Sequence, residues 1–378
     1  MGPLSGIRVI ELAGMGPAPF AAMMLSDMGA EVIRIDRPDR VQAHDAPNVE
    51  VLNRGRRSVA IDCKHPDGVA AVLRLVERAD ALIEGFRPGV VERLGIGPDA
   101  CAARNPRLVY GRMTGWGQDG PWAARAGHDI NYIALAGVLA HLGRADAAPT
   151  PPANLIGDFG GGGMLLAFGV VCGILEAQRS GTGQVIDAAM IDGAALLMTM
   201  LWGYQAMGHW SDARGTNLLD TGAPFYDTYR TSDGHYVAIG ALEPQFYAQL
   251  IQGLGIAETD LPAQGDRSQW PVLRERISAA IASKTRAEWD EIFAGSDACY
   301  APVLTMREAA EHPHAQARQA MIKAFGTVQP APAPRFTKTP GAIAGAPAWP
   351  GEHSDAVLAD WGFTDVEVQA LRATGAIA

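Results

Sequence analysis

The fold is decided by the stretch Gly6–Asp36, GIRVIELAGMGPAPFAAMMLSDMGAEVIRID. Within it, Ile7–Leu12 is a short, largely apolar run with the composition of a buried strand. Pro17–Met28 begins with a proline and continues with helix formers, which predicts a helix. Glu31–Asp36 predicts a second strand. A strand, a helix and a strand in such quick succession indicate the first unit of a parallel α/β sheet.

The same alternation continues through the first hundred residues. Ser58–Asp62, Ala81–Gly85 and Leu108–Met113 predict further strands, and Asp67–Arg78 predicts an amphipathic helix. Because the strands are continuously apolar, we expect a parallel, Rossmann-like sheet covered by helices on both faces.

The turn after the first strand resembles a dinucleotide-binding turn, since Gly14 and Gly16 stand between a strand and a helix. That motif requires a third glycine, and Pro19 stands at its position. A simple strand-to-helix turn accounts for these glycines equally well, so we do not expect NAD to bind here.

The second half of the chain changes character. The expected helices and hairpin strands, in chain order, are Asp129–Leu142, Gly161–Arg179, Ala188–Met207, the hairpin Phe225–Thr231 with Tyr236–Gly240, then Gln245–Leu254, Val272–Ala282 and Arg286–Phe293. Pro330–Pro334 predicts an extended linker, and the tail from Glu352 onward predicts amphipathic helix that docks on the first domain. We therefore expect a large α/β domain over 1–220, a small α+β domain over 221–315, and a linker with C-terminal helices over 316–378 that returns to the large domain.

Composition and charge exclude several classes of protein. The 378 residues are 48% hydrophobic and 19% charged, which excludes a disordered chain. A net charge of −10 argues against nucleic acid or an anionic membrane as the main partner. The four cysteines lie at least 38 residues apart, and neither a metal-ligand spacing nor a disulfide framework can be read from them. The apolar stretches Met164–Ala177 and Ala188–Met207 are too short or too interrupted for a membrane span, and no secretory signal is visible, so we expect a cytoplasmic protein.

Two turns at which a loop leads into a helix, here called corners, contain the residues best suited to catalysis. In Gly127–Tyr132 (GHDINY), Asp129 has the character of a helix N-cap, and that alone could explain it. The preceding His128 would feel the positive end of the helix dipole, which favours a neutral imidazole able to act as a base. Backbone N–H groups at the same turn could hold a developing oxyanion.

The second corner is Asn154–Phe159, followed by the four glycines Gly160–Gly163. Asp158 could cap a helix, but four residues without a Cβ would also let a bulky ligand approach the backbone. The glycines are not followed by the Lys of a phosphate-binding P-loop. Elsewhere, Glu243 precedes Pro244, which favours an extended backbone at the end of a strand. Glu243 is either an acidic residue at the start of a helix with no further role or a functional carboxylate.

At these residues the sequence resembles the family III CoA-transferase superfamily, in particular its α-methylacyl-CoA racemase branch. The likeness extends from Gly6 to His353. Its strongest motifs are Ala126–Tyr132, Asn154–Gly163, Gly183–Asp187, Gly222–Tyr226, Glu243–Tyr247 and Ser296–Leu304. The resemblance implies a large CoA-binding α/β domain, a smaller α+β domain and an interlocked homodimer. One departure is Thr221, where relatives usually have glycine.

The resemblance also implies roles for single residues. His128 and Asp158 would be the catalytic pair, Glu243 would partner His128, and the backbone N–H of Asp129 would be the oxyanion donor. Contacts to CoA and substrate would fall on Arg37, Ile61, Asp62, Cys63, Lys64, Arg93, Gly127, Ile130, Asn131 and Tyr132.

The implied reaction is the interconversion of (R)- and (S)-2-methylacyl-CoA thioesters by 1,1-proton transfer through an enolate. Such a reaction needs a base on one face of the α-carbon and an acid on the other, in complementary protonation states, and a donor for the enolate oxygen. It needs no metal and no cofactor beyond the acyl-CoA substrate. The alternative is a CoA-transferase in which Asp158 attacks the thioester and forms an acyl-enzyme anhydride.

A polyanionic substrate must be reconciled with an acidic chain. Between Arg34 and Lys64 the sequence has seven basic and five acidic residues, so this segment is locally positive. We therefore expect a basic pocket for CoA in an otherwise acidic protein.

Overall fold

The computed structural model describes residues 2–257, 259 and 261–378, and the chain forms two compact units. The large unit comprises Met1–Ala136, Ala153–Leu197 and His314–Ala378. The small unit comprises Gly137–Pro152 and Met198–Pro313. The expected domain boundaries at 220 and 315 stay a prediction, since a compact unit need not fold independently.

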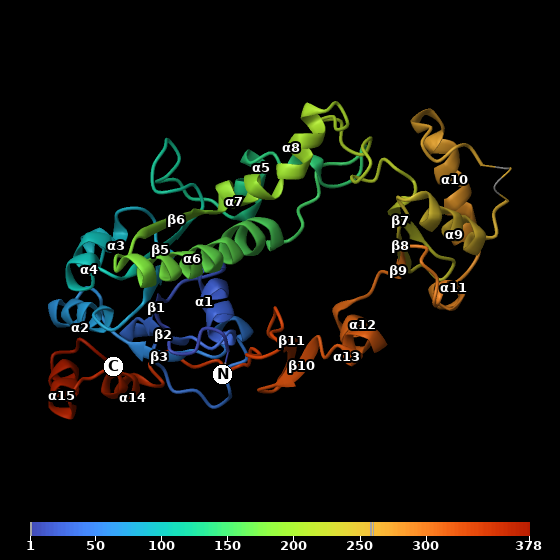
Figure 1. The fold of residues 1–378 in the computed structure, drawn as a ribbon. Coiled ribbons are helices and arrows are strands. Elements are labelled where there is room, and N and C mark those ends of the chain that lie inside the picture. The colour runs from blue at the N-terminus through green and yellow to red at the C-terminus, as the bar shows by residue number, and fades with distance from the viewer. Residues whose placement is uncertain (1, 258, 260) are drawn as a thin grey trace. The chain divides into compact units, whose positions relative to one another are not determined.

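The large unit is built on a six-stranded parallel sheet with the strand order β3-β2-β1-β4-β5-β6 (Figure 1). Its strands are β1 (Arg8–Leu12), β2 (Glu31–Asp36), β3 (Arg57–Ala60), β4 (Ala81–Glu84), β5 (Val109–Thr114) and β6 (Val185–Ala189). The predicted α/β class with a parallel sheet is confirmed.

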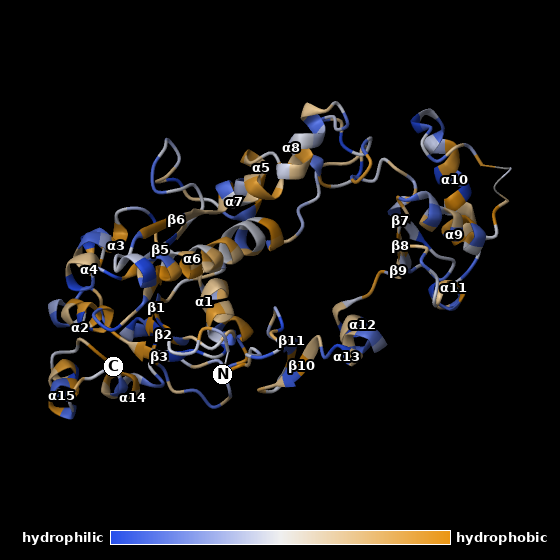
Figure 2. Cartoon of the chain, viewed as in Figure 1, coloured by the Kyte–Doolittle hydropathy of each residue, from blue (hydrophilic) through white to orange (hydrophobic). Residues whose placement is uncertain are grey.

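Helices cover both faces of this sheet. They are α1 (Pro17–Asp27), α2 (Pro66–Val76), α3 (Val90–Arg93), α4 (Pro98–Arg104), α5 (Asp129–Leu135), α6 (Leu165–Ser180), α7 (Met190–Leu197), α14 (Ser354–Asp360) and α15 (Asp365–Ala373). Two short helices, α12 (Met306–Glu311) and α13 (Pro313–Ala317), come before α14 in the chain and are not part of these layers. Successive strand residues alternate between two buried clusters. Val9 belongs to the cluster that contains residues of α1 and α6, whereas Ile10 belongs to the cluster that contains residues of α2 and α14. Figure 2 shows the many hydrophobic residues of α1. This two-sided burial explains why the strands are apolar throughout.

The glycine-rich corner forms differently from the expectation. The predicted helix Gly161–Arg179 begins earlier, as the π-helix η4 (Leu155–Met164), and runs into α6. A Cβ at Gly161 would lie 2.6 Å from the backbone nitrogen of Ala194, and one at Gly163 would lie 2.7 Å from the carbonyl oxygen of Pro17. The glycines therefore let η4 pack on the backbones of α7 and α1, and the idea that they leave room for a bulky ligand was wrong.

Two other expected helices have different bounds. Asp129–Leu142 is helical only to Leu135, because Gly137 adopts a left-handed conformation with φ 84°. Ala188–Met207 begins inside strand β6 and is divided into α7 and α8 (Thr199–Ala206).

The continuous helix Leu155–Ser180 is long and apolar enough, by length and composition, to cross a membrane. It is longer than the stretch Met164–Ala177, from which we expected no span. Leu166 and Val170 of this helix pack over Gly111 of β5, as in the core helix of an α/β sheet. Core helices commonly have this composition, so the helix is weak evidence for a membrane protein, and the cytoplasmic location stays a prediction.

The small unit contains an antiparallel sheet of three strands in the order β7-β8-β9. Its strands are β7 (Tyr226–Arg230), β8 (Tyr236–Gly240) and β9 (Tyr300–Pro302), and its longer helices are α9 (Pro244–Leu254), α10 (Trp270–Ile281) and α11 (Arg286–Phe293). The predicted hairpin and the three helices that follow it are confirmed to within two residues. Thr221 has φ 76°, a left-handed conformation that favours glycine.

The C-terminal tail returns to the sheet, as expected. Helix α14 lies beside β3 and α15 packs on α14 (Figure 1), and Ile377 forms an antiparallel bridge with Ile61. Just before the tail, the predicted linker at Pro330 is partly a hairpin of β10 (Met321–Ala324) and β11 (Thr327–Pro330). Arg54 holds this hairpin by donating to the Gln329 side chain at 2.9 Å and the Pro330 carbonyl at 2.8 Å.

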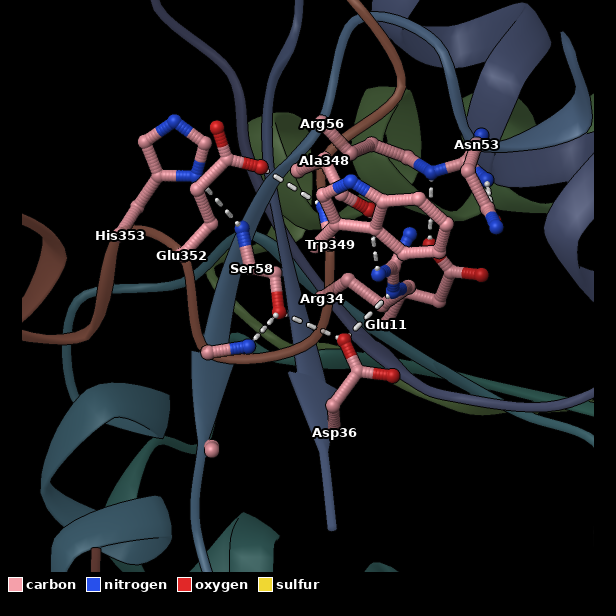
Figure 3. A network of polar contacts seen from close by, with 12 residues as sticks. Glu11, Arg34, Asp36, Asn53, Arg56, Ser58, Ala348, Trp349, Glu352 and His353 are labelled. Atoms are coloured by element: carbon pink, nitrogen blue, oxygen red, sulfur yellow. Dashed lines mark hydrogen bonds and ion pairs between the residues drawn. The ribbon is translucent and has the colours of Figure 1, made fainter. Parts of the chain in front are cut away.

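A buried ionic network ties the tail to strands β1–β3 (Figure 3). Asp36 accepts from Arg34 at 2.7 Å and from the Ser58 hydroxyl at 2.6 Å, and that hydroxyl accepts from the Gly351 N–H at 2.8 Å. Arg56 pairs with Glu11 at 2.9 Å, with both side chains fully buried.

This network changes the interpretation of the basic segment. Arg34, Arg54 and Arg56 are at most 4% exposed and are neutralised by buried carboxylates. The local excess of positive charge between Arg34 and Lys64 therefore does not form a pocket as a whole. Its exposed cations are confined to residues such as Arg37 and Lys64.

Trp361 tests the docking of the tail, since its side chain is fully buried among β-sheet and α2 residues. Replacing Trp361 by Ala should lower the free energy of unfolding by about 3–5 kcal/mol, because a large cavity would open in the core. Urea denaturation followed by circular dichroism measures this loss. Val366→Ala, at a position 79% exposed, is the control and should change it by less than about 0.5 kcal/mol.

Candidate active site

The assigned residues of the large unit gather at one edge of the parallel sheet. Arg37 follows β2, Ile61–Lys64 follow β3, Arg93 ends α3 after β4, and Gly127–Tyr132 follow β5. Parallel strands place their carboxyl ends at a common edge, and ligands of open α/β sheets bind there, where the strand order reverses. Here the reversal lies between β1 and β4.

His128 is the N-cap residue of α5, in an extended conformation with φ −133°. Its backbone N–H donates to the Asn131 side chain at 3.0 Å, and its side chain is exposed. The expectation that Asp129 is the N-cap was wrong by one residue. Asp129 is the first helical residue instead, and a backbone N–H in the first turn has no acceptor within the helix.

The Asp129 carboxylate joins the two acidic corners. It is 4% exposed, and its Oδ1 accepts the backbone N–H of Asp158 at 2.7 Å. Burial raises the pKa of Asp129, while hydrogen bonds from the backbone of Asp158 and Gly157 act in the opposite direction. A Cβ on Gly157 would lie 2.5 Å from the same oxygen, so the carboxylate reaches the second corner only over a glycine.

Asp158 lies within the first turn of η4 and is not its N-cap, because the helix begins at Leu155. Its Oδ2 accepts from the Asn154 side-chain amide at 3.0 Å. Sequence reasoning gave Asn154 no role, although it stands four residues before Asp158. That spacing carries meaning only on a helix, and the helix was expected to begin later.

The glycine turn after β1 contacts Asp158. A Cβ on Gly16 would lie 3.4 Å from Asp158 Oδ2, and Gly16 has φ 69°. The turn that resembles a dinucleotide motif thus forms part of the wall around a carboxylate.

Tyr132 packs behind the first corner. Its hydroxyl donates to the carbonyl of Gly127, and its ring meets Trp116 edge-on with centroids 4.7 Å apart. Burial is the main cause that raises the pKa of Tyr132, and the nearby charge of Asp158 adds to it. The side chains of Tyr132 and Asn131 are therefore engaged within the corner, whereas Ile130 is 43% exposed.

Glu243 belongs to the small unit. It is the exposed N-cap residue of α9, with an extended backbone before Pro244, as expected. Because His128 belongs to the large unit, the pairing of Glu243 with His128 stays a prediction.

The residues assigned to CoA differ in what they offer. Arg37, Lys64 and Arg93 are exposed cations, although Arg37 also pairs with Asp39. Asp62 accepts the Lys64 N–H at 2.9 Å and so shapes its loop. Ile61 is 1% exposed, which restricts it to backbone contacts, and burial raises the pKa of the Cys63 thiol to about 11. Among the described residues, no three His, Cys, Asp or Glu side chains are grouped as metal ligands would be.

A model of CoA-transferase family III matches residues 4–354. The chain belongs to this family. Alpha-methylacyl-CoA racemases from Mus musculus and Homo sapiens are each 46% identical to it, over 97% of this chain and 96% of theirs. The succinyl-CoA–D-citramalate CoA-transferase of Chloroflexus aurantiacus is 31% identical over 98% of this chain and 97% of its own length.

Solved structures of family members share the fold. A CAIB/BAIF family protein from Brucella suis superposes with a TM-score of 0.81 at 26% identity, covering 95% of this chain and 99% of that one. A Mycobacterium tuberculosis protein gives a TM-score of 0.77 at 27% identity, covering 94% and 98%.

Gly157 tests whether the two corners depend on their close approach. Gly157→Ala should lower the free energy of unfolding by about 2 kcal/mol, because the new methyl group would collide with the Asp129 carboxylate. The control is Gly203→Ala in α8, where a new Cβ would meet nothing within 4 Å. This substitution should stabilise the helix by about 0.5–1 kcal/mol. Equal effects at both positions, measured by urea denaturation, would contradict the close contact.

Proposed function

We propose that this chain is a racemase that interconverts (R)- and (S)-2-methylacyl-CoA thioesters. The observation that carries the proposal is the pair of corners bearing His128 and Asp158, joined by the Asp129 carboxylate, in a chain 46% identical to racemases over nearly its whole length. The transferases that it resembles are more distant, at 31% identity for the Chloroflexus aurantiacus enzyme.

The reaction requires two groups on opposite faces of the α-carbon. One member of the His128–Asp158 pair removes the α-proton, and the electron pair of that C–H bond moves into the enolate of the thioester. The other member delivers a proton to the opposite face and inverts the centre. The roles exchange in the reverse direction, so both groups must change protonation state together.

The enolate oxygen needs a donor that is already in place. The backbone N–H of Asp129 stands in the first turn of α5, where the positive end of the helix dipole also favours a negative charge. Asp129 therefore has two roles in the proposed mechanism. Its backbone N–H donates to the oxyanion, and its carboxylate accepts the backbone N–H of Asp158 and so fixes that residue.

Substrate binding follows from the same sheet edge. We assign the CoA phosphates to Arg37, Lys64 and Arg93, which are exposed cations that follow β2, β3 and β4 along the chain. The thioester would then extend toward the corners after β1 and β5. Proton transfer at the α-carbon changes no oxidation state, so we assign acyl-CoA as the substrate and no further cofactor.

A CoA-transferase mechanism is the alternative. In it, the Asp158 carboxylate attacks the thioester carbonyl, CoA leaves as the thiolate, and an acyl-aspartyl anhydride remains. Asp158 is partly exposed and could act so, but this mechanism gives His128 no part.

Solvent exchange tests the racemase. When (S)-2-methylacyl-CoA is incubated with the protein in deuterium oxide, the substrate should lose enantiomeric purity and gain deuterium at the α-carbon. Chiral chromatography measures the first change and mass spectrometry the second. His128→Gln and Asp158→Asn should each slow racemisation by about 10²–10⁴-fold, the range of acid–base catalysis. Val366→Ala is the matched control on the surface and should keep full activity.

Other outcomes would reject the proposal. Wild-type protein that exchanges no α-proton, but transfers CoA to an added carboxylic acid and yields a hydroxylamine-sensitive adduct on Asp158, would establish the transferase instead.

We also propose that the protein acts as a homodimer, as the resemblance implies. Helix α6 leaves Phe168 68% exposed and Leu175 48% exposed, and large apolar side chains in such positions commonly lie in interfaces. A second copy of the chain is the partner to which we assign this surface.

Sedimentation tests the dimer. The wild-type protein should sediment at twice the 39.9 kDa chain mass, and Phe168→Asp should shift it toward the monomer, because a carboxylate would be buried unpaired in the interface. Val366→Asp is the control, since its side chain lies on the exposed side of α15. A wild-type monomer at micromolar concentration would contradict this part of the proposal.

A further inference from the structure

A buried carboxylate outside the catalytic corners lies at the carboxyl end of β4. Glu84 is the last residue of that strand and is fully buried. Its Oε2 accepts the backbone N–H of Phe86 at 2.6 Å, and its Oε1 accepts Nε of Arg112 at 3.1 Å. Arg112 is its direct neighbour on β5 in the strand register. Glu84 thus fixes, by hydrogen bonds, the first turn of the loop that leaves the strand.

Arg112 extends these contacts to the helix that follows. Its Nη1 pairs with the Glu92 carboxylate of α3 at 2.8 Å, so a single guanidinium links the end of β4 to α3. The loop Gly85–Gly89 and α3 are consequently held at both ends by one chain of charged groups, Glu84–Arg112–Glu92.

The segment held in this way carries cations on both sides of the substrate edge. Arg93 lies next to Glu92, and a Cβ on Gly89 would lie 3.2 Å from Arg93 Nη1, so the guanidinium folds back over the loop. At the other side, the charge of Arg87 acts on Tyr132 of α5, where it opposes the stronger effects of burial and Asp158 on the pKa of that residue. The loop that Glu84 holds thus carries Arg87, whose charge reaches Tyr132, and is covered in part by Arg93.

We propose that Glu84 is a positioning residue for acyl-CoA: through the Phe86 N–H and through Arg112 it fixes the Gly85–Gly89 loop and α3, and so presents Arg93 to the substrate's phosphate groups. This inference rests on the proposed function, since it takes Arg93 as a contact to CoA. Glu84 touches no reacting atom, so its removal should affect binding more than chemistry.

Stability alone does not explain the carboxylate. Burial raises the pKa of Glu84 to about 7, against the opposing effects of the Phe86 N–H and Arg112, so the fold disfavours its charge. Buried ion pairs seldom stabilise more than apolar residues of the same size would, and their best-attested role is to fix geometry. The charge of Glu84 costs stability but fixes the Gly85–Gly89 loop, as expected for a positioning residue.

The groups around Glu84 also set the pH range in which its charge-assisted hydrogen bond with Arg112 is lost. Arg112 from β5 and Glu92 from α3 act on Glu84, and Glu84 in turn acts on Tyr110 of β5, on which Cys101 of α4 also acts. Burial raises the pKa of Tyr110, and that of Cys101 to about 12, so both stay neutral around pH 7. Glu84 becomes protonated as the pH falls through about 7, and it then loses its charge-assisted bond with Arg112.

The test separates binding from turnover. In the wild type, KM for 2-methylacyl-CoA should rise as the pH falls from 8 to 6. Glu84→Gln should raise KM by on the order of ten-fold at pH 8, remove this rise, and leave kcat within about two-fold. Glu77→Gln is the matched control, because Glu77 pairs with Arg104 on the surface and contacts no part of the cluster.

A double-mutant cycle identifies Arg93 as the residue through which Glu84 acts. Arg93→Ala should raise KM, and Glu84→Gln added to it should raise KM little further. Fully additive effects, or a Glu84→Gln enzyme with wild-type KM and pH profile, would overturn the inference. If Glu84→Gln fails to fold, Glu92→Gln replaces it, since Glu92 is 44% exposed and its loss removes only the last link to α3.

Two further measurements separate this inference from the proposed function. Calorimetric titration with CoA alone should show the same ten-fold loss of affinity in Glu84→Gln, whether or not the enzyme exchanges an α-proton. Thermal unfolding should show that the wild type loses stability as the pH rises through about 7, because the raised pKa favours the protonated native state below that pH. Glu84→Gln should flatten this decline.

Discussion

The active edge of this protein depends on one geometric constraint: parallel strands deliver their carboxyl ends to the same side of a sheet. Four strands of the large unit, β2 to β5, are followed there by residues with a functional assignment, and the turn at Gly16 after β1 contacts Asp158. No single loop could hold an acyl-CoA. The sheet brings short segments from the first 130 residues into one surface, and each strand needs to contribute only one or two side chains. The corner of Asp158, which follows no strand, is added through the Asp129 carboxylate.

Buried charge is used repeatedly to fix these segments. Asp129 holds the backbone of Asp158, Asp36 and Ser58 hold the tail at Gly351, and Glu84 holds the loop after β4. In each case a carboxylate or hydroxyl meets a backbone N–H directly, so the hydrogen bond fixes chain direction and not only side-chain position. The desolvation of these groups costs stability, which the two large apolar clusters of the sheet offset.

Most elements follow from local sequence. Strands β1 to β5 could be predicted because two-sided burial makes them apolar. His128, Asp158 and Glu243 were chosen because they stand in motifs of a known family, and their catalytic roles stay predictions. The start of η4 could not be predicted, since glycines weaken every helix signal and its length is set by packing against Gly193 of α7. Nor could the neutralisation of Arg34, Arg54 and Arg56, because their partners are far away in the sequence. Glu84 was missed for the same reason, since Arg112 is 28 residues away. Asn154 was missed because its partner Asp158 lies four residues ahead on a helix that was expected to begin later.

The docking of the tail has a consequence for synthesis on the ribosome. Trp361 and Ile377 complete the apolar cluster that β3 and α2 begin some three hundred residues earlier. In the nascent chain the part of this cluster beside β3 therefore stays uncovered while the whole small unit is made, although α2, α3 and α4 already cover the rest of that face. The small unit has its own core and is complete before the last helices appear. A ribosome that stalls late would thus leave the apolar residues around β3 exposed beside a complete small unit, and exposed apolar surface of this kind promotes aggregation.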